Sequence, residues 1–283
     1  MKRSAGAALV AFALSAPALP AQSMRSFTVA RQRHGEQRLS ARLDYAAGSL
    51  RVVAGIPSGD LYRMRLWYDA ERFTPTTRFE AATGTVQLGL SGTGGAGLRV
   101  VSAERGEQSA VLTITPEVPV ALTIRLGAVD ADLDLGGLQL TGLDLGTSAS
   151  RTTVRFSRRN AARCASAVFS AGAADISIVD LGNSGCRRVR VEGGVGKTLL
   201  DLTGAWPAGA RIDVRMAVGA LSLRLARSVG VRLTMDRFLS SFPAAGWVRR
   251  GDALLSDGYA RAERRIDVSL SATIGGVSIQ WVE

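Results

Sequence analysis

A pattern that occurs three times between residues 164 and 225 constrains the fold more than any other feature of this sequence. Each copy has a short alternating strand, a glycine turn and a second alternating strand. Cys164 and Cys186 each lie eight residues before the matching glycine of their own copy. A fixed period of about 22 residues is typical of a solenoid, in which each coil is stable only when stacked on its neighbours. We therefore predict an all-β, right-handed β-solenoid built from strand–glycine–strand coils of about 20–24 residues.

Similar strand–glycine–strand segments occur elsewhere in the chain, at 43–53, 79–90, 120–136 and 266–281. The alternation lapses between residues 236 and 265, where Phe238, Phe242, Trp247 and Tyr259 occur among several arginines. The open end of a stack must be covered to prevent edge-to-edge growth, so we interpret this segment as a C-terminal cap. An exposed aromatic patch for a membrane or a ligand is the alternative.

The N-terminus has the features of a secretory signal peptide over residues 1–21. Lys2 and Arg3 precede a short apolar run, and Ala21 ends a candidate cleavage site; a buried helix or a retained anchor is the alternative. No later apolar run reaches transmembrane length. We expect an exported protein, periplasmic or extracellular, with no transmembrane segment in the mature chain. Residues 22–38 are polar and basic and are expected to form a flexible lead-in.

The two cysteines of the chain are predicted to form a disulfide. Equivalent positions on adjacent coils lie about 4.8 Å apart, which is within the range that a disulfide spans. An oxidising compartment outside the cytoplasm would favour the bond. Two free thiols in the core are the alternative.

Arginine dominates the charge of this chain, which has a formal net charge of +11 and only two lysines, Lys2 and Lys197. Arginines cluster around the middle coils, and we treat seven of them as a candidate anion-binding surface: Arg155, Arg158, Arg159, Arg163, Arg187, Arg188 and Arg190. Guanidinium groups bind carboxylates and phosphates in a bidentate manner. The partners considered are an anionic envelope polymer, lipid headgroups or a membrane protein. Nucleic acid is not expected, because the chain is exported and lacks a stacking platform. A merely solubilising surface is the alternative.

Other motifs indicate turns rather than chemistry. The segment 192–198 resembles a phosphate-binding loop, but Val191 replaces its first glycine and no helix is expected to follow. Asp134, Asp144, Asp180 and Asp201 follow strands, where aspartate bonds to its own turn; calcium binding is the alternative. His34 is the single histidine and has no neighbours at ligand spacing. We expect no metal, no cofactor and no catalytic residues.

Several segments resemble known bacterial families. Gly48-Ser-Leu-Arg-Val, Pro75 and the run from Leu122 through Asp130, Asp132 and Asp134 to Leu138 resemble the toast-rack domain. The segment 194–206, Val218-Gly-Ala-Leu-Ser-Leu and the closing Ile274-Gly-Gly-Val-Ser-Ile resemble LiaF-like, cell-wall-active antibiotic response proteins. The resemblance implies a β-rich repeat fold outside a bacterial membrane, without catalysis. Toast-rack-like repeats are expected over 39–146 and a continuous LiaF-like solenoid over 147–283. Some members regulate envelope stress through membrane helices, which this chain lacks.

The function expected from the sequence is therefore non-catalytic. We predict a bacterial envelope protein that binds or scaffolds, in an envelope-stress role or another, through an arginine-rich solenoid surface. The alternative is a carbohydrate-active β-helix enzyme or an adhesin that acts on a polysaccharide. Paired carboxylates on a β-solenoid could cleave such a chain, and Asp130, Asp132 and Asp134 share one face. A groove lined by carboxylates and aromatic side chains would distinguish that alternative.

Overall fold

The computed structural model describes residues 23–93, 108–236 and 245–283, which form seventeen β-strands and one short 3-10 turn, Leu181–Ser184. The first nine strands are β1 (Met24–Gln32), β2 (Leu39–Ala54), β3 (Asp60–Asp69), β4 (Phe73–Glu80), β5 (Thr85–Gly92), β6 (Ser109–Ile114), β7 (Pro119–Asp134), β8 (Gln139–Thr147) and β9 (Arg151–Arg155). The others are β10 (Cys164–Ala173), β11 (Asp175–Val179), β12 (Cys186–Asp201), β13 (Ala210–Ala226), β14 (Val229–Asp236), β15 (Trp247–Arg250), β16 (Ala253–Ser256) and β17 (Arg264–Val282). The prediction of an all-β protein is confirmed. The predicted signal peptide, residues 1–21, lies outside the described residues.

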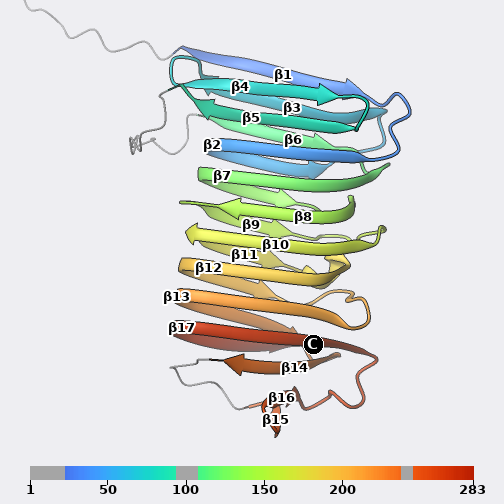
Figure 1. The fold of residues 1–283 in the computed structure, drawn as a ribbon, viewed down its shortest axis with the longest axis vertical. Helices are drawn as coiled ribbons and strands as arrows, with labels where there is room; N and C mark the ends of the chain where they lie inside the picture. The colour runs from blue at the N-terminus through green and yellow to red at the C-terminus, as the bar shows by residue number, and fades with distance from the viewer. Residues whose placement is uncertain (1–22, 94–107, 237–244) are drawn as a thin grey trace, which may run out of the picture.

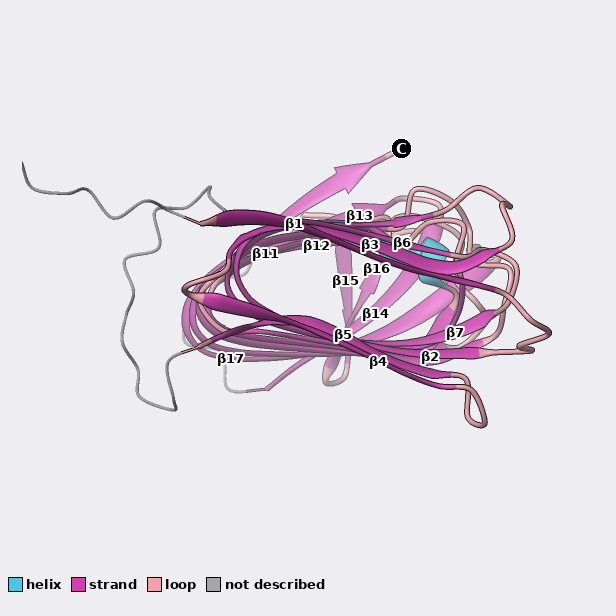
Figure 2. Ribbon diagram, turned by 90° about the horizontal axis from the view of Figure 1, so that it is seen from above, coloured by secondary structure: helices cyan, strands magenta, loops and turns pink. Residues whose placement is uncertain are grey.

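The strands stack along one axis and form two layers (Figures 1 and 2). Long strands bend once, so their first halves lie in one layer and their second halves in the other. We call these layer 1, which contains β4, β5, β8, β10 and β14, and layer 2, which contains β1, β3, β6, β9 and β11. Neighbouring coils pair in parallel and in register; Cys164 lies opposite Cys186, and Arg188 opposite Arg211.

Aliphatic side chains at alternate positions fill the space between the two layers. Leu43 of β2, Ile124 of β7 and Leu145 of β8 are completely buried, whereas the residues between them along each strand face outward. A strand presents every second side chain to the same face, so one aliphatic set per coil produces a continuous core along the stack. The period of two read from the sequence thus corresponds directly to the inward and outward faces.

Glycine is required where the coils bend from layer 1 to layer 2. Gly196 pairs with Gly219, and Gly219 pairs with Gly275. Their φ angles are +143°, +145° and +147°, in a region that side chains rarely adopt. A Cβ atom on Gly219 would also lie 1.9 Å from the carbonyl oxygen of Gly196. At these stacked glycine positions, successive bends therefore approach too closely for a side chain.

The N-terminal part differs from a uniform series of coils. Residues 22–38 were expected to be a flexible lead-in, but they contain β1, which pairs antiparallel with β3. That expectation is wrong because Phe27 and Val29 alternate along β1 and pack against the core. The strands β4 and β5 form an antiparallel hairpin around Gly84, whose φ of +64° allows a tight turn. The glycine of 79–90 therefore marks a hairpin turn and not a bend between layers.

The C-terminal end also has an unexpected strand order. The last strand, β17, lies between β13 and β14 and pairs in parallel with both (Figure 1). Beyond β14, the hairpin of β15 and β16 covers this end of layer 1. Part of the predicted cap, residues 237–244, lies outside the described residues.

Candidate functional site

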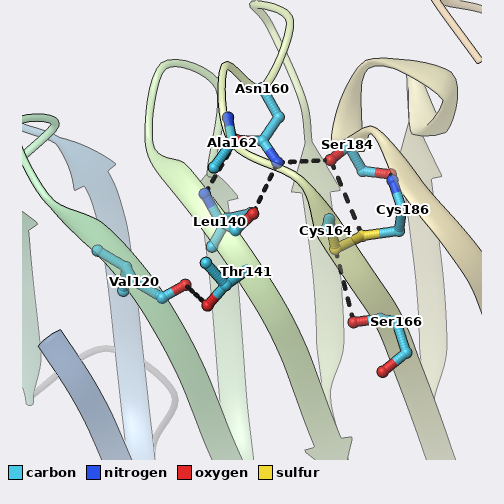
Figure 3. The surroundings of a disulfide bond; sticks show 9 residues. All are labelled: Val120, Leu140, Thr141, Asn160, Ala162, Cys164, Ser166, Ser184 and Cys186. Carbon is cyan, nitrogen blue, oxygen red and sulfur yellow. Dashed lines mark hydrogen bonds between the residues drawn. A yellow bond between two sulfur atoms is a disulfide. The ribbon is translucent and has the colours of Figure 1, made fainter. Parts of the chain in front are cut away.

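The middle coils are joined by a disulfide between Cys164 and Cys186, as predicted (Figure 3). The two residues are in-register partners on β10 and β12, with their Cα atoms 4.3 Å apart. Both are buried, so the bond belongs to the core. Closing a loop of this length stabilises a fold by about 3 kcal/mol in the chain-entropy model.

Asn160, beside the disulfide, joins three successive coils and was not identified from the sequence. Its Oδ1 accepts a hydrogen bond from the Leu140 amide at 2.9 Å, and its Nδ2 donates to the carbonyls of Leu140 and Ser184 at 2.8 and 2.9 Å (Figure 3). Asn183 repeats the arrangement one coil later, bonding to Phe156 and Ala205. The sequence does contain these two asparagines one coil apart. Asparagine is common in turns, however, so their presence alone does not identify them as residues that link coils.

The structure divides the seven candidate arginines among three places. Arg155 points outward from β9 in layer 2, and Arg188 and Arg190 point outward from β12 in layer 1, on the opposite side of the molecule. Four others lie where the chain crosses back to layer 1, in the loop after β9 or at the start of β12: Arg158, Arg159, Arg163 and Arg187. All seven are exposed, and none forms an ion pair within the described part of the chain. We call the four arginines at the crossing the crossover arginines.

The aspartates that follow strands differ in their partners; Asp180, for example, accepts a hydrogen bond from the Thr203 hydroxyl at 3.0 Å. Asp134 accepts from the Gly136 amide at 3.0 Å and Asp201 from the Thr203 amide at 3.0 Å, which is the predicted turn geometry. Asp144 instead forms an ion pair with Arg125 of the preceding coil. No group of three or more histidine, cysteine, aspartate or glutamate side chains could hold a metal ion among the described residues.

Two grooves flank the bend between the layers. One, of about 480 Å³, is lined mainly by small residues of β2, β7, β10 and β12 and includes Asp130, Arg151 and Asp175. Arg151 pairs in register with both aspartates, and its guanidinium lies 3.9 Å from Asp130. The other, of about 710 Å³, is lined by residues such as Ser91, Gly127, Gly146 and Gly172.

The segment 192–198 forms part of the bend within β12, and it continues as strand into layer 2. No helix N-terminus is therefore available there to bind a phosphate group. Elsewhere, the Nδ1 atom of His34 lies 3.0 Å from the carbonyl oxygen of Gln32. Within the described ranges, no helix is both long and apolar enough to cross a membrane.

An exposed tryptophan was missed. The alternation that points Arg63 and Arg65 outward on β3 also points Trp67 outward, and 48% of that residue is exposed. The sequence contained the information needed to predict this exposure, because alternate residues of a strand point to the same face and Trp67 follows Arg65 by two.

Comparison with known proteins gives one matching family and several solved structures of low sequence identity. A family model, the N-terminal domain of toast_rack (DUF2154), matches residues 20–179. No curated protein matches the chain. A proposed cell adhesion protein from Clostridium sporogenes has 15% identity and a TM-score of 0.49, with 92% of this chain and 100% of that chain covered. A proposed adhesin from Bacteroides fragilis has 11% identity and a TM-score of 0.42, with 93% and 99% covered. Since the family model covers more than half of its length, this chain belongs to the toast-rack family.

Proposed function

We propose that this protein is a non-catalytic component of the bacterial envelope, exported to the periplasm or the cell surface. It binds or scaffolds an anionic partner through arginines on the outside of a right-handed β-solenoid. The partner is an envelope polymer, a lipid headgroup or a membrane protein. Within this proposal, residues 39–146 form the toast-rack-like part and residues 147–283 the LiaF-like part of one continuous stack.

The observation that carries the proposal is the state of the crossover arginines. Arg158, Arg159, Arg163 and Arg187 are exposed and lack an ion-pair partner among the described residues, beside a core cross-linked by a disulfide. Guanidinium groups that are not neutralised internally attract anions and bind them in a bidentate manner. A disulfide in the core supports export, because such bonds persist in oxidising compartments.

The groove beside the bend supports binding over hydrolysis. A carbohydrate-active enzyme would need carboxylates beside a platform for the sugar ring. The groove of about 480 Å³ contains Asp130 and Asp175, but Arg151 lies between them and none of its lining residues is aromatic.

Retention on an anionic glycan column tests the proposal. The protein should bind at low salt and elute at high salt, because exposed charges are screened. The fourfold variant R158Q/R159Q/R163Q/R187Q should elute at clearly lower salt. The matched control R25Q/R78Q/R249Q/R250Q removes the same charge from exposed arginines near the ends of the stack. Equal shifts for the two variants would show that only net charge matters and would contradict the proposal.

A further inference from the structure

Three strongly exposed apolar side chains lie in or beside the N-terminal part of layer 2, and two of them, Trp67 and Val111, are diagonal neighbours on β3 and β6. Trp67 on β3 is 48% exposed, Val111 on β6 is 40% exposed, and Ile56 in the loop after β2 is 80% exposed. The other strongly exposed large apolar residues in the described ranges are valines at the bend or in the cap: Val195, Val218 and Val248. Trp67 is thus the one aromatic residue of this set.

Register places two arginines next to this tryptophan. Arg65 lies opposite Val111, and Val111 lies opposite Arg51 on β2. The backbones that carry the two arginines are therefore about 10 Å apart, since adjacent strands are about 4.8 Å apart. Trp67 follows Arg65 by two residues and shares its face. We call Arg51, Arg65, Trp67 and Val111 the Trp67 surface.

The surroundings of the Trp67 surface leave it open. The in-register neighbours of Trp67 are Ser26 and Ser109, whose short side chains cannot cover an indole ring. Neither Arg51 nor Arg65 forms an ion pair within the described part of the chain, whereas Arg63 is held by Asp60 at 2.6 Å.

An acidic border lies on one side of this surface. Asp132 of β7 is the next in-register neighbour of Arg51, and Asp130 and Asp134 flank it on the same outer face. Like charges across a short distance repel, so this border disfavours an anionic ligand over β7. An anionic ligand is therefore directed onto β2, β6 and β3.

We propose that the Trp67 surface binds an acidic polysaccharide. One sugar ring stacks on the exposed face of Trp67, and carboxylate or sulfate groups of the chain bind Arg65 and Arg51. A flat strand face with short neighbours suits an extended polymer. A lipid surface would require several apolar anchors to insert together, whereas Trp67 is bordered by serines. The inference rests on the proposed function, for which it names a ligand class and a second surface.

Binding of polygalacturonate at low salt, measured by titration calorimetry, tests this surface. The variants W67A and R51Q/R65Q should each bind about tenfold or more weakly, as expected for losing a ring contact or charge-assisted hydrogen bonds. W67F should retain part of the affinity because it keeps an aromatic face. D132N should bind more tightly, because a repelling charge beside Arg51 is removed. The control R78Q/R250Q removes equal charge from exposed arginines that lie outside both candidate surfaces, and it should bind as the wild type does.

The outcomes separate this inference from the proposed function. If W67A and R51Q/R65Q bind normally while the fourfold variant of the crossover arginines does not, the Trp67 surface is not the site, and the proposed function survives. Equal losses in R51Q/R65Q and R78Q/R250Q would also overturn the inference. So would binding to phosphatidylglycerol vesicles that depends on Trp67 without any binding to polygalacturonate. Circular dichroism confirms that each variant is folded.

Discussion

At the scale of single residues, the buried hydroxyl of Tyr45 is expected to destabilise the folded protein. The residue is 1% exposed in β2, and its hydroxyl has no hydrogen-bond partner among the residues that the structure describes. Burial raises the pKa of Tyr45 well above its ordinary value. Asn160 forms the contrast, because its buried amide has partners on both atoms.

Replacing Tyr45 with phenylalanine should therefore stabilise the protein. The variant Y45F removes an unpaired buried hydroxyl, and we expect the free energy of unfolding to rise by about 1 kcal/mol. A raised pKa in the folded state means that stability is complete below the ordinary pKa of 10.0 and declines as the pH rises above it. This alkaline decline should be shallower in Y45F. Urea denaturation between pH 7 and 11 measures both effects; a less stable Y45F would show that the hydroxyl has a partner.

At the scale of elements, the bend is the most constrained part of each coil. A side chain would clash at some glycines of the bend but not at others. A Cβ on Gly219 would meet the backbone of Gly196, whereas a Cβ on Gly276 would meet nothing within 4 Å. We expect the substitution G219A to lower the free energy of unfolding by about 3 kcal/mol or more, because it strains the backbone and displaces the neighbouring coil. G276A, the matched control in the neighbouring coil, should be nearly neutral. Thermal unfolding of both variants checks this, and equal melting temperatures would contradict the stacked bends.

The sequence predicted the elements better than their arrangement. Period two and the repeated cysteine and glycine positions were sufficient for the stacked middle coils and for the disulfide. The alternation along β9 and β12 accounts for the outward orientation of Arg155, Arg188 and Arg190. It could not assign them to layers, because that depends on which half of a bent strand carries each residue. Asn160 was missed for a related reason: its side chain forms hydrogen bonds with the coils before and after its own.

The position of β17 could not be predicted from the sequence either. Between β13 and β17 the regular period is interrupted by β14, β15 and β16, so Ala210 pairs with Ile266, far along the chain. Local patterns carry no information about such a pairing. The same holds for the antiparallel strands at the N-terminal end, where the turn at Gly84 makes β4 and β5 a hairpin and not a bend between layers.

At the scale of the whole molecule, β17 links the last regular coil to the cap. Its residues Ile266, Val268 and Leu270 are buried, and the strand pairs with β13 along its length and with β14 on the other side. In a stack where each coil contacts only its neighbours, losing one coil should loosen the adjacent strands and leave distant coils intact.

A chain that ends at Glu263 should therefore lose order at one end only. We expect amide hydrogen exchange to accelerate in β13 and β14, which lose their shared partner, while β7, β8 and β10 keep their protection. Deletion through Gln32 is the matched control, because it removes β1 from the other end, and it should leave β13 and β14 protected. If the first truncation leaves β13 and β14 protected, the cap does not depend on β17. If protection is lost everywhere, the stack unfolds as one cooperative unit and its stability is not a sum over neighbouring coils.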